Sequence, residues 1–578
     1  MSPELAATLA VAEWLLDAAD HCLARDERDA AFFATRLAAT TLARQARVLM
    51  HPRIERNILT LAAGVPAARV SDGLPDDASS GTRAPRGCLH VLTQALPAGG
   101  HTAMATRWIA SEATGDQHSV ALLAQRTEVP PALQAAVDAR KGRIHLAPDR
   151  AGPLEVAGWL RALAVRTASR VVFHVDVDDL VPAIAFGVPE GPPTIVVNHA
   201  AHIFWAGASV ADCIANCRGS DLEVEWTRRY RGAGDRSRIV PIPLVDVDPP
   251  DDAAQVRLEA RRRLGLPDTA PVLLSIGDTY KYAPFAHAGL DFLATVRELL
   301  ERAPDAWFLV VGVAADARWA AAAEAVGGRL RVFGRQSDLK PFHLAADLYL
   351  EGFPFGSTTA LLEAGLRGLA AVPAPAVSPP PFGTDGIAVD RVLARPATTA
   401  DYVDTALRLL ASPAEREESG RRLAAEIRRH HMGDGWNRHV ADVLETLPRE
   451  HRIYEPETPP STPAAVHEYW TAFRETCWKG VASDVPTHRL IQEGLVALTA
   501  RGIRVRVPRG LRRAHAPLAG RRRGDAVPLS LLALATNVIR PWLPEARFRS
   551  MLDTLTTLFR PGSATSRTFS SLLPESLW

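Results

Sequence analysis

Three consecutive hydroxyl residues, Ser357, Thr358 and Thr359, follow a turn that ends at Gly356. A β-prone run, DLYLE, precedes the turn, and an amphipathic stretch that ends near Gly368 follows the hydroxyls. This order predicts a strand, a turn and a helix, with the serine at the N-cap. The first N–H groups of a helix and its positive dipole end attract anions. The pattern therefore fits a phosphate site, and it also fits an ordinary capped helix.

A lysine occupies a matching place earlier in the chain. Lys281 follows the apolar run PVLLSIG, which predicts a buried strand that ends at Gly277. A cation just past a strand end could neutralise a diphosphate. A surface lysine in a loop is the alternative. Because the lysine and the hydroxyl-bearing helix start fall in the same predicted domain, we expect them to bind one diphosphate.

Two histidines follow predicted strands in the first half of the chain. His101 comes after the glycine pair that ends at Gly100, and His202 comes after the run TIVVNHA. Paired glycines let a backbone approach a ligand closely. A histidine at a cleft edge could act as a general base near neutral pH, and either residue could instead cap a helix or pack in the core. His174 and Asp176, at another strand end, are weaker candidates of the same kind.

Alternating strands and helices must position these side chains. Residues 87–247 and 248–450 each read as a doubly wound parallel sheet, and the run VDVDPPDD separates them. Open α/β sheets bind ligands outside the carboxyl ends of their strands. The sequence therefore predicts an α/β fold of two Rossmann-like domains facing a cleft. Gly100, Gly277 and Gly356 are the glycines expected at that cleft.

The two ends of the chain differ from the centre. Residues 1–86 read as a helical extension followed by a polar linker, and residues 451–578 as a proline-rich linker followed by a mostly helical region. The stretch 501–523 is dense in arginine and could meet phosphates, nucleic acid or a membrane surface. Its one aromatic ring, His515, gives poor support for stacking on bases. We expect no nucleic-acid partner, and peripheral membrane contact is an alternative to a solvated or interface role.

Composition limits the remaining classes. The chain has 578 residues with 66 Lys+Arg and 65 Asp+Glu, so no overall field favours a polyanion. Glu4 and Asp17 make the N-terminus a poor signal peptide, and the run at 526–539 is too short to span a membrane. Five cysteines indicate a reducing compartment. Cys213 and Cys217, placed on one strand, would stand roughly 13 Å apart. We predict a cytoplasmic protein with no metal ligands and no cofactor.

The segment LYLEGFPFGSTTALLEAGLRG resembles the donor motif of the O-GlcNAc-transferase-like clan of GT-B-fold glycosyltransferases, which includes bacterial soluble N-glycosyltransferases. The resemblance covers residues 87–447 loosely and is specific only at 346–372 and 271–284. It implies that the Ser-Thr-Thr group holds the donor diphosphate, that Glu363 meets the ribose hydroxyls and that Lys281 is the phosphate-binding lysine. It also implies a nucleotide-sugar donor, with a UDP-sugar expected first.

The spacing of two glutamates departs from a related pattern. Retaining glycosyltransferases of this kind carry a closer pair, whereas Glu351 and Glu363 here are twelve positions apart. We therefore expect an inverting enzyme.

The expected function is metal-independent transfer of a hexosyl or N-acetylhexosaminyl group from a nucleoside diphosphate sugar to a protein, glycan or other acceptor. His202 or His101 would serve as the base. A sugar-nucleotide epimerase with the same donor site is an alternative, and a non-catalytic scaffold whose helical ends bind partners is another.

Overall fold

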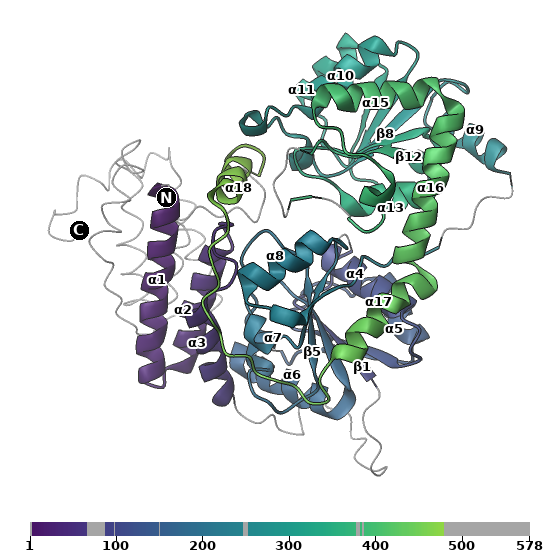
Figure 1. Ribbon diagram of the computed structural model, residues 1–578. Coiled ribbons are helices and arrows are strands. Elements are labelled where there is room, and N and C mark those ends of the chain that lie inside the picture. The colour runs from purple at the N-terminus through teal and green to yellow at the C-terminus, as the bar shows by residue number, and fades with distance from the viewer. Residues whose placement is uncertain are drawn as a thin grey trace, which may run out of the picture.

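The computed structural model describes residues 3–65, 87–97, 99–149, 151–246, 252–376, 382–383 and 386–478. Two parallel sheets form two lobes, the first below the second in Figure 1. Within the described ranges, no helix is both long and apolar enough to cross a membrane. The predicted polar linker at 71–86 and the arginine-dense stretch at 501–523 lie outside those ranges.

The first lobe contains a seven-stranded parallel sheet in the order β3-β2-β1-β4-β5-β6-β7. Its central strands are mostly apolar and wholly buried, as expected of parallel strands covered by helices on both faces. β7 ends at Ile239, because Pro241 and Pro243 have no N–H to donate to a sheet. The strands are β1 (Gly87–Leu92), β2 (Gln117–Leu122), β3 (Ile144–Leu146), β4 (Arg170–His174), β5 (Thr194–Asn198), β6 (Cys213–Asn216) and β7 (Ser237–Ile239), and the helices are α4 (Gly100–Ser111), α5 (Pro131–Ala139), α6 (Pro153–Thr167), α7 (Val181–Ala185) and α8 (Asp221–Arg231).

The second lobe contains a five-stranded parallel sheet in the order β10-β9-β8-β11-β12. β8 and β11 are neighbours, so the loops that follow them leave the same edge of the sheet side by side. The strands are β8 (Val272–Ile276), β9 (Trp307–Val311), β10 (Leu330–Phe333), β11 (Leu348–Leu350) and β12 (Ala370–Val372), and the helices are α9 (Ala253–Arg263), α10 (Phe292–Arg302), α11 (Ala317–Ala325), α12 (Lys340–Ala345), α13 (Thr358–Leu366), α14 (Val389–Val392), α15 (Thr399–Ala411) and α16 (Pro413–His431).

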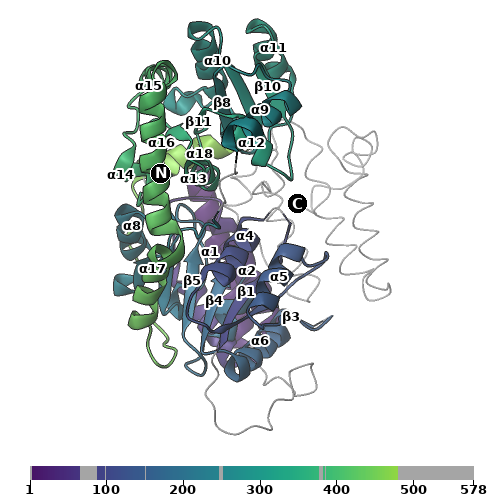
Figure 2. The same cartoon turned by 90° about the vertical axis from the view of Figure 1, so that its right-hand side faces the viewer.

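Three N-terminal helices pack on the first lobe, which confirms a helical extension. α1 (Pro3–Ala24), α2 (Arg28–Leu42) and α3 (Pro52–Ala63) share one apolar core with α6, α7 and the first sheet. Glu55 of α3 is buried and accepts hydrogen bonds from the backbone N–H groups of Gly207 and Ser209. The extension is therefore part of the first lobe's core (Figure 2).

The chain returns to the first lobe after α16. The sequence analysis places residues up to 450 in the second domain, whereas α17 (Gly433–Thr446) packs against the first sheet. Trp436 donates its indole N–H to the carbonyl of Pro241 at 2.8 Å, and Asn437 exchanges hydrogen bonds with the backbone of Ser111 and Ala113. Burial of Trp436, with its indole N–H hydrogen-bonded, places α17 on the first lobe although the helix directly follows α16 in the sequence.

The last described helix, α18 (Ala464–Thr476), lies between the lobes. Its rings join an aromatic cluster that we call the interlobe aromatic cluster. The members come from three parts of the chain and are His202, Phe355, Phe382, Trp470 and Phe473.

Candidate functional site

Lys281 and the start of α13 meet in the structure. The lysine lies in the single-turn helix Thr279–Tyr282 that follows β8, and its Nζ donates a hydrogen bond to the carbonyl of Gly356 at 3.1 Å. Gly356 is two residues before the first residue of α13. The two loops predicted to bind one diphosphate therefore converge.

The N-terminus of α13 has no side-chain cap. Ser357 is the N-cap residue, but its hydroxyl accepts no hydrogen bond from the helix. Among the described residues, no hydrogen-bond partner is found for the side-chain hydroxyls of Ser357, Thr358 or Thr359, and all three residues are only partly buried. Free N–H groups at a helix start together with unpaired hydroxyls make an anion site.

Gly277 allows the lysine loop to touch this helix start. A Cβ on Gly277 would lie 2.8 Å from the hydroxyl of Ser357 and 2.9 Å from that of Tyr282. Gly352, on the other loop, is pressed against the ring of Tyr282 in the same way. The third predicted cleft glycine, Gly100, is exposed, and a Cβ there would meet nothing within 4 Å.

Burial changes the charge balance around the lysine. It lowers the pKa of Lys281 to about 8, against an opposing effect of the Glu351 carboxylate. Burial also raises the pKa of Glu351 to about 7, and one oxygen of this carboxylate accepts a hydrogen bond from the backbone N–H of Ala374 at 2.8 Å. The cation is therefore partly buried, and an anionic ligand would be attracted more strongly there than at the open surface.

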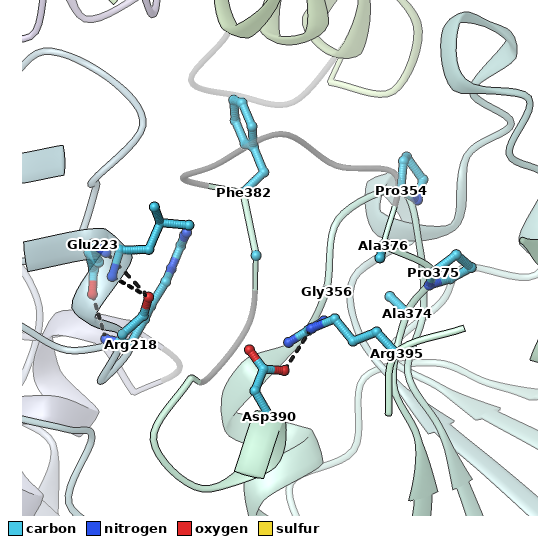
Figure 3. Close-up of a pocket in the computed structure, with 13 residues that line it drawn as sticks. Arg218, Glu223, Pro354, Gly356, Ala374, Pro375, Ala376, Phe382, Asp390 and Arg395 are labelled. Carbon is cyan, nitrogen blue, oxygen red and sulfur yellow. Dashed lines mark hydrogen bonds and ion pairs between the residues drawn. The ribbon is translucent and has the colours of Figure 1, made fainter. Parts of the chain in front are cut away.

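A cavity of about 180 Å³ opens beside Gly356 between the two lobes (Figure 3). Arg218 enters from the loop after β6 of the first lobe, and Arg395 enters from the second lobe, where it pairs with Asp390 at 2.7 Å. The sequence analysis missed both arginines. Arg218 directly follows Cys217, which the sequence predicts to lie on a strand, and ligands bind outside the carboxyl ends of such strands, so this arginine could have been predicted. The lining residues are Arg218, Ser220, Leu222, Glu223, Pro354, Gly356, Ala374, Pro375, Ala376, Phe382, Gly383, Asp390 and Arg395.

Glu363 forms an ion pair across the cleft. It lies on α13, and its carboxylate accepts a hydrogen bond from the guanidinium of Arg107 on α4 of the first lobe. Both side chains remain about a quarter exposed, at 26% and 22%. The residue predicted to meet a ribose thus forms an ion pair between the two lobes in this structure.

His101 stands in the first turn of α4, at the carboxyl edge of the first sheet. Its Nδ1 lies 3.6 Å from a carboxylate oxygen of Asp176, and its ring centroid lies 4.3 Å from that of His199. Burial lowers the pKa of His101 below 6.5, and the Asp176 carboxylate opposes this shift. The side chain is 30% exposed, so a neutral imidazole beside a carboxylate can accept a proton from solvent-accessible groups.

His202 lies elsewhere, inside the interlobe aromatic cluster. It is 8% exposed, and its ring centroid lies 4.7 Å from that of Trp470 and 5.2 Å from that of Phe382. Burial lowers its pKa well below 6.5. The structure does not bring the two predicted bases together, and it gives His202 the surroundings of a packing residue.

Comparisons with known proteins find structural neighbours but no sequence relatives. No family model matches the chain, and no curated protein matches it. Anabaena HepE in complex with UDP is 14% identical, with 62% of this chain and 100% of that chain covered and a TM-score of 0.46. A mutant O-GlcNAc transferase from Thermobaculum terrenum is 15% identical, with 81% and 85% covered and a TM-score of 0.41. WaaG, a glycosyltransferase of lipopolysaccharide biosynthesis, is 17% identical, with 62% and 99% covered and a TM-score of 0.40.

A function for this chain has to come from the residues of its own cleft. Its two parallel sheets and the cavity between them are the arrangement of the GT-B fold. The described part of the chain has two Rossmann-like domains facing a cleft.

Proposed function

We propose that this protein transfers a sugar from a nucleoside diphosphate sugar, with a UDP-sugar expected first, to a protein, glycan or other acceptor. One observation carries the proposal. The Nζ of Lys281 reaches the loop that opens α13, where the first N–H groups have no side-chain cap and where three hydroxyls have no partner within the described part of the chain. This combination of charge and donors suits a diphosphate.

The leaving group determines what these residues would do. When the bond between the sugar and the diphosphate breaks, negative charge grows on the diphosphate oxygens. Lys281 and the helix start would stabilise that charge from fixed positions, which is effective because they need no rearrangement. The protein's own groups would thus neutralise the negative charge on the leaving diphosphate, which supports a transfer that is independent of a divalent ion.

His101 is the better of the two predicted bases for an inverting reaction. In that reaction the acceptor attacks the sugar carbon from the side opposite the diphosphate, and a base removes the acceptor's proton. His101 has a carboxylate partner and solvent access, whereas His202 is enclosed by rings. Asp176 would orient the imidazole and stabilise the imidazolium that forms.

Calorimetric titration with UDP, GDP and dTDP tests the donor site. Thr358→Ala should bind the preferred diphosphate more weakly than the wild type. Thr446→Ala is the matched control, because that hydroxyl bonds only within its own helix α17. Product analysis with the matching nucleotide sugar should then show sugar on an acceptor. Binding of no diphosphate, or conversion of the donor to an epimer alone, would refute the proposal.

A further inference from the structure

Three side chains that could bind a metal lie on one face of the first sheet. Cys88 and His90 are two residues apart on β1, so they point to the same side of the strand. The parallel register places His118 of β2 directly beside Cys88. The sequence predicted no metal ligands, because His118 comes from a different strand from the other two residues and no sequence spacing records their pairing.

The spacing of their ligand atoms fits one cation. The Sγ of Cys88 lies 3.6 Å from the Nε2 of His90, and that nitrogen lies 3.0 Å from the Nδ1 of His118. All three ligand atoms lie within 4.8 Å of one another. Zinc bonds of about 2.3 Å to sulfur and about 2.0 Å to nitrogen, at tetrahedral angles, separate neighbouring ligands by roughly 3.3–3.6 Å.

Polar groups also lie beside the outer nitrogens of both histidines. The other nitrogen of His90 lies 3.1 Å from the Nε2 of His174, which would accept its N–H. The outer nitrogen of His118 is buried, has no hydrogen-bond partner among the residues that the structure describes, and lies 3.8 Å from a carboxylate oxygen of Glu112. Metal-bound histidines commonly donate their second N–H to a carboxylate or another acceptor, which fixes the ring.

Charged side chains lie beside this group. Arg170 pairs with Glu112 and with Asp116, the latter at 2.6 Å. Burial raises the pKa of the Cys88 thiol, and the Arg170 guanidinium opposes this shift. A cation bound at the site would therefore have to displace the thiol proton.

We infer that Cys88, His90 and His118 bind one thiophilic cation, with Zn²⁺ the expected ion. All three residues are at most 1% exposed, so this is a closed site inside the first lobe, separate from the cleft. The ion would join β1 to β2 beneath α4, the helix that carries His101. Binding would release the thiol proton of Cys88 and replace the contact between the two imidazoles with two metal–nitrogen bonds.

Metal analysis of the full-length protein tests this site. The protein should be reconstituted with Zn²⁺ under reducing conditions, desalted and measured by plasma mass spectrometry. We expect roughly one equivalent of zinc per chain, or of copper if the protein has acquired Cu⁺ during expression. Reconstitution with Co²⁺ should give a thiolate-to-cobalt charge-transfer band.

Variants show whether the three residues supply the ligands. Cys88→Ser should remove the charge-transfer band, and His118→Gln should lower the metal content. Cys213→Ser is the matched control, because Cys213 is a buried cysteine in the same apolar cluster and should keep the band. If the substituted proteins fail to fold, the number of zinc ions per chain in the reconstituted wild type still tests the site. Less than about 0.1 equivalents in the reconstituted wild type, or a band that survives in Cys88→Ser, would refute the site in favour of a histidine pair joined by a hydrogen bond.

Discussion

Replacing Lys281 with methionine should weaken diphosphate binding without weakening the fold. Methionine keeps the length and apolar stem of the lysine and removes its charge. Burial lowers the pKa of Lys281 from 10.5 to about 8, which corresponds to about 3 kcal/mol against the charged form at 1.36 kcal/mol per pKa unit. The folded protein carries this cost below pH 8 and loses it as the pH rises from 8 towards 10.5. Below pH 8, the substitution should therefore leave the melting temperature unchanged or raise it.

The ligand is expected to supply the counter-charge that the folded protein lacks. A hydrogen bond from a charged donor contributes about 1.5–3 kcal/mol, so Lys281→Met should weaken UDP binding about 10- to 100-fold. The loss in turnover should be larger, about 100- to 1000-fold in kcat, because charge grows on the diphosphate as the donor bond breaks.

Two measurements on the same protein separate binding from folding. Isothermal calorimetry gives the UDP affinity, and thermal unfolding gives the stability. Lys340→Met is the matched control, because Lys340 is an exposed lysine of the same lobe and should leave both values unchanged. A Lys281→Met protein that melts earlier but binds UDP as tightly as the wild type would show that the lysine is structural.

Three further predictions concern the same cleft. The value of kcat/KM should fall above about pH 8, where free Lys281 loses its proton; a profile that stays flat through this range would contradict the assignment. Gly277→Ala should lower the free energy of unfolding in urea by about 1–3 kcal/mol, because the added methyl overlaps two hydroxyls. Gly100→Ala should leave it unchanged, and equal effects would argue against the packing described. His101→Ala should lower kcat about 100-fold or more with UDP affinity unchanged, and Asp176→Asn should lower kcat by less; a loss of UDP affinity instead would place His101 in the donor site.

Local sequence patterns predict the two sheets well. Apolar runs such as PVLLSIG and TIVVNHA lie on β8 and β5, because parallel strands buried on both faces leave a continuous apolar signal. The convergence of Lys281 on the helix start was also predictable. Both follow strands of one predicted sheet, and the loops after such strands lie at the same sheet edge; the strands, β8 and β11, are neighbours.

Contacts between distant parts of the chain were not predictable in this way. α17 has the same amphipathic character as a helix of the second lobe, and only the fit of Trp436 against the first lobe decides its position. The enclosure of His202 depends on Trp470, which lies far along the sequence on α18. Cys88 and His118 pair through strand register, which no spacing in the sequence records.

Two of the contacts between the lobes differ greatly in strength. Residues of the first lobe, the second lobe and α18 share one apolar core, and separating them would expose large rings to water. The Arg107–Glu363 pair is partly exposed, and such pairs contribute about 0–1 kcal/mol. The lobes should therefore rotate about a hinge on the aromatic side, and the cleft should open on the side of the ion pair. A substrate that binds Glu363 would break the ion pair as it enters.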